Sequence, residues 1–118
     1  MTGQTGKLRE VNLERGMPTW DQAVRQLTFE LRHSRSLGFG AVKIIHGYGS
    51  SGRGGRIRVE SRKYLSRLKS RGEIADFIPG EEFSIFNSAT LAAFRRCDGL
   101  RRDPDLERHN NGITIILL

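Results

Sequence analysis

Residues 41–55 read AVKIIHGYGSSGRGG, an apolar run followed by a histidine and a turn rich in glycine. The run from Ala41 to Ile45 carries apolar side chains on both faces, which predicts a central strand covered on both sides. A strand, a glycine-rich turn and a helix start together form the arrangement in which a chain presents bare backbone N–H groups to an anion. The stretch therefore predicts an α/β domain with an anion-binding loop after its central strand.

The segment after the glycines has the apolar spacing of an amphipathic helix, and Gly72 is placed to end it. Such a helix packs on the sheet by its apolar side and displays its charges outward in two flanks. The predicted buried side is Ile57, Ser61, Tyr64, Leu65 and Leu68; one flank is Arg58, Arg62 and Lys69, and the other is Arg56, Lys63 and Arg67.

The residues before the apolar run predict a strand followed by a helix. Residues 10–14 alternate polar and apolar side chains, which is typical of a strand. Thr19 and Gln22 have the spacing of a capping box, and Gly38 suits the position after the last helical turn. The predicted buried face of this helix is Trp20, Val24, Leu27 and Leu31.

Two further strands are predicted toward the C-terminus, at residues 74–78 and 113–118. Pro79-Gly80 closes the first, and Asn110-Asn111-Gly112 provides a turn before the second. The second of these strands is almost wholly apolar, so we expect it to be buried in the sheet.

Residues 81–112 form an insert before the last strand, in which Asn87 is placed to cap a short helix. Its role can be that of a lid, a partner surface or a packing element. The predicted order is β-α-β-α-β-β, a two-layer α+β arrangement with a four-stranded sheet and two main helices. A single domain is expected over residues 9–118, after a flexible lead at 1–8.

The positive charge of the chain is concentrated directly after the glycine-rich turn. The chain has 20 Lys and Arg against 13 Asp and Glu, a net charge of +7. Glu60 is the single acidic residue between positions 53 and 71, so this segment accounts for the whole excess. A basic patch of this kind is typical of polyanion binding, although many charge runs are only solvated helix faces. Its basic residues are Arg53, Arg56, Arg58, Arg62, Lys63, Arg67, Lys69 and Arg71.

Composition also excludes several classes of protein. No apolar run approaches the roughly 20 residues that span a bilayer. Cys97 is the single cysteine, which excludes an intramolecular disulfide and a cysteine-based zinc cluster. The first residues lack the apolar core of a signal peptide, so a cytoplasmic location is the expectation.

The run Ile44-Ile45-His46-Gly47-Tyr48-Gly49, between a capped helix and a basic one, resembles the small MutS-related (Smr) domain family. The family's hallmark is an apolar strand that ends in His-Gly-x-Gly, and His46, Gly47 and Gly49 match it. The resemblance implies a mixed four-stranded sheet with two helices, similar to the C-terminal domain of translation initiation factor three. It also implies binding to nucleic acid, with nicking or cleavage of DNA or RNA, and some members act on messenger RNA at stalled ribosomes.

One family motif is altered in this chain. Nuclease-active members carry Leu-Asp-x-His at the end of the first strand, where this chain has Val11-Asn12-Leu13-Glu14. Asparagine replaces the aspartate and glutamate replaces the histidine, so no catalytic role carries over from that motif.

Two interpretations of the site remain open. In the first, His46 exchanges protons near neutral pH and Glu14 orients it or acts as the complementary acid or base. Such an endonuclease can use the 2′-hydroxyl of RNA as its nucleophile, so no cofactor is expected and a divalent metal is not indicated. In the second, His46 caps the loop through hydrogen bonds, Glu14 faces solvent, and the protein binds without cutting.

For binding, Gly47 and Gly49 are expected to bring backbone N–H groups close to a phosphate. Tyr48 can stack on a base or simply cover the loop. RNA or ribosome-associated RNA is the favoured partner, ahead of DNA. The expected phosphate contacts are Arg53, Arg56 and Arg58, followed by Arg62 and Lys63.

A third interpretation is a nucleotide- or cofactor-binding module. Gly47, Gly49 and Gly52 satisfy the dinucleotide-binding pattern, and Glu73 lies near the distance of a ribose-binding acid. However, Glu73 follows the helix-ending Gly72 and precedes the third strand, so this remains a minor alternative.

Overall fold

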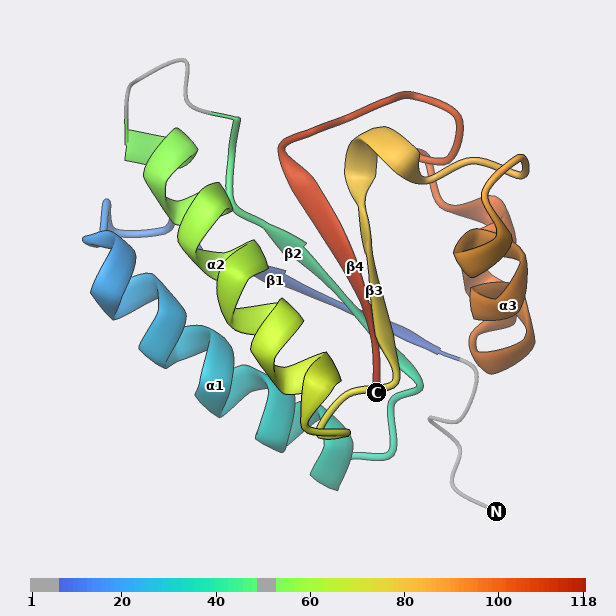
Figure 1. Ribbon diagram of the computed structural model, residues 1–118, viewed down its shortest axis with the longest axis horizontal. Helices are drawn as coiled ribbons and strands as arrows, with labels where there is room; N and C mark the ends of the chain where they lie inside the picture. The colour runs from blue at the N-terminus through green and yellow to red at the C-terminus, as the bar shows by residue number, and fades with distance from the viewer. Residues whose placement is uncertain (1–6, 49–52) are drawn as a thin grey trace.

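A mixed four-stranded sheet with helices on both faces forms the domain, as the computed structural model shows for residues 7–48 and 53–118 (Figure 1). This confirms the predicted fold class and element order. The strands are β1 (Leu8–Asn12), β2 (Ala41–Ile45), β3 (Asp76–Pro79) and β4 (Ile113–Leu117). The helices are α1 (Trp20–Ser36), α2 (Arg53–Ser70) and α3 (Ser88–Arg96), with 3₁₀ turns η1 (Gly80–Glu82) and η2 (Asp98–Arg102).

The strand order in the sheet is β1-β2-β4-β3, so β2 and β4 are central. β1 runs parallel to β2, with Leu8 opposite Ala41 and Asn12 opposite Ile45. β4 runs antiparallel to both β2 and β3. Because β1 and β2 are parallel, the segments that follow Asn12 and Ile45 leave the sheet at the same edge.

α1 and α2 cover one face of the sheet (Figure 1). The capping box of Thr19 and Gln22 is present, and Gly38 follows the end of α1 with a φ of +84°. The predicted buried face of this helix is only partly correct, since Leu27 and Leu31 are buried but Val24 is only half-buried. Trp20 is 37% exposed and does not join the core, because the buried face of α1 is offset to Ala23, Leu27, Leu31 and Ser34.

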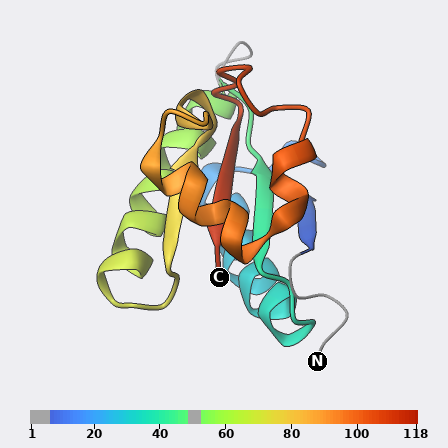
Figure 2. The same ribbon diagram turned by 90° about the vertical axis from the view of Figure 1, so that its right-hand side faces the viewer.

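The insert covers the opposite face of the sheet (Figure 2). Asn87 caps α3 as expected, since its side chain accepts a hydrogen bond from the Thr90 N–H. The insert therefore acts as a packing element and adds a third layer to the two predicted. The core on this side comprises Ala41, Ile78, Phe83, Ala93, Phe94, Cys97, Leu100, Ile113, Ile115 and Leu117. In the part of the chain described, no helix is long and apolar enough to cross a membrane.

Two strand boundaries differ from the alternation pattern. β1 begins at Leu8, a residue expected in the flexible lead. It ends at Asn12, because the Asn12 side chain accepts a hydrogen bond from the Glu14 N–H and the chain turns there. β3 begins at Asp76 rather than Ile74, since the Glu73 N–H is still bonded to the Leu68 oxygen of α2 and the chain joins the sheet only after it. β3 can end on Pro79 because an edge strand tolerates a residue without an N–H.

Candidate nucleic-acid interface

His46 is fully buried at the end of β2, on the side of the sheet covered by α2. Its Nδ1 lies 2.8 Å from the backbone oxygen of Gly47, and its Nε2 lies 2.8 Å from Oγ1 of Thr114 in β4. A carbonyl oxygen only accepts hydrogen bonds, so the proton of the neutral ring is on Nδ1. The Thr114 hydroxyl then donates to Nε2.

A chain of hydrogen bonds extends from His46 to the surface through Thr114. The Arg62 Nε–H donates to Oγ1 of Thr114 at 3.1 Å. The two terminal nitrogens of Arg62 donate to the two carboxylate oxygens of Glu81, each at 2.8 Å. Each donor in this series of hydrogen bonds has an acceptor, and both ring nitrogens of His46 are hydrogen-bonded within the protein. The geometry thus gives His46 a structural role and leaves no ring nitrogen for a substrate.

The electrostatics agree with a neutral ring. Burial lowers the pKa of His46 from its usual 6.5 to about 4. The nearby positive charges of Arg62 and Arg58 act in the same direction, whereas the Gly47 carbonyl and Glu81 oppose them. A group that loses its proton this easily is a poor general base near pH 7.

Gly47 adopts a left-handed conformation, with a φ of +76°, directly beneath the Glu14 carboxylate. A Cβ atom at this position would lie 1.9 Å from Oε1 of Glu14. We expected the Gly47 N–H to face a phosphate, but it donates to the backbone oxygen of Gly112 at 3.0 Å. Glycine is needed here for its backbone conformation and for the close approach of Glu14.

Glu14 and His46 lie at the ends of adjacent parallel strands, as the sequence suggested. The Glu14 side chain is exposed, and none of the hydrogen bonds found among the described residues joins it to His46. The Oδ1 of Asn12, at the position where nuclease-active Smr domains carry an aspartate, accepts the Glu14 N–H at 2.8 Å. The altered first-strand motif thus forms a turn at this edge of the sheet.

The turn at 110–112 is hydrogen-bonded to the two residues directly after β2, His46 and Gly47. The oxygen of Gly112 accepts the N–H groups of both His46 and Gly47. Oδ1 of Asn110 accepts the Gly112 N–H at 2.9 Å, and Nδ2 of Asn110 donates to Asp105 at 2.9 Å. The backbone of His46 and Gly47 is therefore tied to the insert on the far face of the sheet.

Lys43 anchors this part of the insert from within β2. Its side chain is almost fully buried and pairs with Asp103 at 3.0 Å and with Asp105. Burial alone would lower the pKa of Lys43, but hydrogen bonds to Asp105 and Asp103 outweigh it and raise the pKa above its usual value. Sequence reasoning missed this group, although a single lysine in a covered strand signals a buried counterion.

The basic side chains predicted to contact phosphates differ in how exposed they are. Arg56 and Lys63 are exposed on α2, and their ion pairs are within the helix, to Glu60. Arg58 is half-buried, and it lies close enough to His46 to lower the pKa of that histidine. Arg62 is instead directed inward to Glu81 and Thr114. The expected contacts at Gly49 and at the Arg53 side chain lie outside the described residues.

The first residues of α2 also favour an anion, because the first turn of that helix contains no acidic side chain. Tyr48 is 58% exposed at the same edge. Its ring lies against the turn at Gly112, where an added Cβ would be 3.2 Å from the Tyr48 Cδ1.

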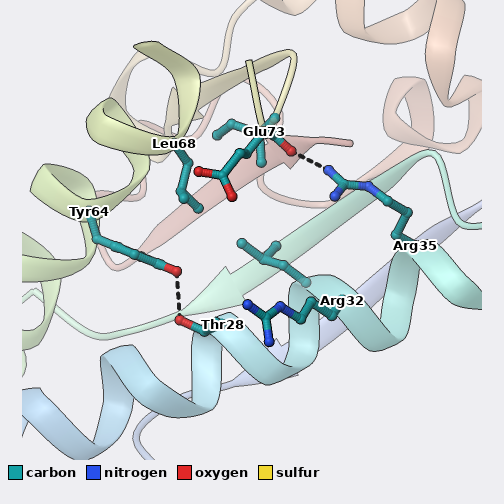
Figure 3. Close-up of a pocket in the computed structure, with 8 residues that line it drawn as sticks. Thr28, Arg32, Arg35, Tyr64, Leu68 and Glu73 are labelled. Atoms are coloured by element: carbon teal, nitrogen blue, oxygen red, sulfur yellow. Dashed lines mark hydrogen bonds between the residues drawn. The ribbon is translucent and has the colours of Figure 1, made fainter. Parts of the chain in front are cut away.

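Glu73 lies at the other end of α2 from the glycine loop. Its backbone oxygen accepts a hydrogen bond from Arg35 beside a pocket between α1 and α2 (Figure 3). That pocket has a volume of about 50 Å³, room for one or two water molecules. Glu73 therefore cannot serve as a ribose-binding acid for a nucleotide on the loop.

Within the described residues, no group of three or more His, Cys, Asp or Glu side chains is arranged to hold a metal ion. Comparison with protein-family models, with curated proteins and with solved structures finds no match for this chain. The resemblance to Smr domains thus rests on the His46-Gly47-Tyr48-Gly49 motif and its place after the central strand.

Proposed function

We propose that this chain is an Smr-like nucleic-acid-binding domain, which binds RNA or ribosome-associated RNA in preference to DNA and acts in the cytoplasm. The nucleic acid lies along the edge where β1 and β2 end and over the first turns of α2. The observation that supports this most is the outward display of Arg56 and Lys63 on the helix that follows the glycine loop, with the half-buried Arg58 on the opposite flank, near His46.

A polymer fits this surface better than a small phosphate compound. Positions 56 and 63 are about 10 Å apart along a helix, which is more than one phosphate group covers. The chain's entire net charge of +7 belongs to the segment 53–71. Contacts of this kind hold the phosphate backbone in place without reading its sequence.

Binding is proposed without a cleavage step at His46. Cleavage needs a group that takes a proton from the nucleophile, and the His46 ring is buried with both nitrogens hydrogen-bonded. The exposed carboxylate of Glu14 lies above Gly47, and no hydrogen bond found among the described residues joins it to His46. No cofactor is part of the proposal.

Two double variants with identical charge changes test the proposal. R58Q/K63Q removes one arginine and one lysine from the N-terminal part and the middle of α2, and K69Q/R71Q removes one of each at the C-terminal end of α2 and just beyond it. Affinity for single-stranded RNA and duplex DNA is measured by fluorescence anisotropy over a range of salt concentrations. For single strands, we expect R58Q/K63Q to reduce the slope of log K against log salt by about 1.4, because two phosphate contacts are lost.

K69Q/R71Q should keep the slope of the wild-type protein, since Lys69 and Arg71 pair with Asp76 and Glu73 away from the loop. Equal effects of the two double variants would contradict the proposed location. Weak salt dependence combined with tight binding of NAD or ATP would instead favour the nucleotide-binding module.

A further inference from the structure

An exposed tryptophan lies at the edge of the molecule assigned to nucleic acid. Trp20 is the first residue of α1, and the N-terminal ends of α1 and α2 lie at the same end of the domain (Figure 1). The Arg56 guanidinium lies over the Trp20 ring, 5.0 Å from its centroid, and the ring is still 37% exposed. A cation and an aromatic surface are therefore already stacked at the start of α2.

This pair is poorly explained as core packing. The adjacent turns of α1 fill the core with Ala23 and Leu27, which are fully buried. Within the described part of the chain, the ion pair of Arg56 is a 4.0 Å contact with Glu60, so its charge is only weakly compensated. A partner that offers both a flat π-surface and negative charge would satisfy both side chains.

We propose that Trp20 and Arg56 form a stacking platform for an unpaired base, so that the domain prefers single-stranded nucleic acid to duplex. This inference rests on the proposed function and adds the class of ligand. Every base has a π-face that stacks on an aromatic ring or a guanidinium, and such contacts are tolerant of sequence. In a duplex those faces are stacked within the helix and cannot reach the platform.

The remaining contacts at this edge suit the same ligand. Lys63 follows Arg56 on the same flank of α2 and can contact a phosphate next to the stacked base, and Arg58 lies on the opposite flank, near His46, where it can contact a phosphate further along the strand. Tyr48 provides a second exposed aromatic ring at the same edge of the sheet. Aromatic side chains among basic ones are typical of grooves that bind single strands.

Trp20 is the single tryptophan of the chain, so its fluorescence reports on the platform directly. We expect oligo-uridylate and oligo-thymidylate to quench the emission of Trp20, and a duplex of equal phosphate number to bind without quenching. W20L should weaken single-strand binding by about 5- to 100-fold and leave duplex binding unchanged. W20F should retain most of the affinity, because a smaller aromatic ring still stacks.

F29L is the matched control, because Phe29 is another aromatic residue of α1, 62% exposed and stacked on His33. It should bind both ligands as the wild-type protein does. Circular dichroism of each variant verifies that it is folded.

The outcomes separate this inference from the proposed function. If neither single strands nor duplex bind in anisotropy, the proposed function fails. If both bind but Trp20 emission is unchanged and W20L affects neither, the function stands and the platform is wrong. Polyglutamate that binds as tightly as oligo-uridylate, with the same dependence on Trp20, would overturn the nucleic-acid platform and indicate an acidic protein partner.

Discussion

At the scale of single residues, the role of His46 depends on which groups its ring nitrogens contact. The sequence places His46 after an apolar strand, where it can act as a general base or cap a loop. Thr114 and Arg62 decide between these, and they are 68 and 16 positions away in the chain, so local pattern cannot supply them. A single threonine within the apolar last strand was the one available signal. Trp20 shows the same limit, because helical spacing predicted burial and a small offset of the helix left it exposed.

A neutral, buried His46 makes stability depend on pH. The folded-state pKa of about 4 lies below the unfolded value of 6.5, so the unfolded chain binds more protons between these values. The free energy of unfolding is therefore unaffected by protonation of His46 above pH 6.5. It decreases as the pH falls toward 4, by up to about 3 kcal/mol. Urea denaturation at pH 7 and pH 4.5 should show this loss in the wild-type protein and a smaller one in H46Q.

H33Q provides the comparison, because His33 is exposed on α1 and its replacement should keep the pH dependence of the wild-type protein. The ring itself can be followed by NMR. A His46 that titrates near pH 6.5, or carries its proton on Nε2 at neutral pH, is incompatible with the structural role described above.

At the scale of elements, short-range chemistry was predictable and long-range support was not. The capping box of α1, the Asn87 cap of α3 and the glycine at the end of α1 are formed as expected, because each depends on residues within a few positions. The layer formed by the insert could not be predicted, because it depends on the ion pair between Lys43 and Asp103, which are 60 positions apart in the sequence. Hydrogen bonds through Asp105 and Asn110 connect Lys43 to the turn at Gly112, which accepts the N–H groups of His46 and Gly47.

We expect K43M to destabilise the domain by about 3 kcal/mol or more, because it leaves two carboxylates without their buried cation. K69M makes the same change in an exposed pair with Asp76 and should cost less than about 1 kcal/mol. Guanidinium denaturation measures both. Hydrogen exchange at the His46 and Gly47 N–H groups should also become faster in K43M alone. Similar costs for the two variants would show that the buried cluster does not support the loop.

At the scale of the whole molecule, charge and topology act together. Parallel pairing of β1 with β2 brings two loops and the starts of two helices to one edge of the sheet. The sequence predicted this edge from the apolar run and the glycines, and it predicted that the positive charge follows directly. It did not predict that Arg62 is used internally, or that Trp20 joins the exposed surface, because both depend on how α2 sits between α1 and β4.

The most direct measurement is a titration of the ¹⁵N-labelled domain with oligo-uridylate, followed by two-dimensional NMR. We expect shifts at the Trp20 indole N–H, at the backbone of Tyr48 and in the first turns of α2, with α3 unaffected. Shifts that are confined to α3 and the insert, with the loop edge unchanged, would contradict this prediction.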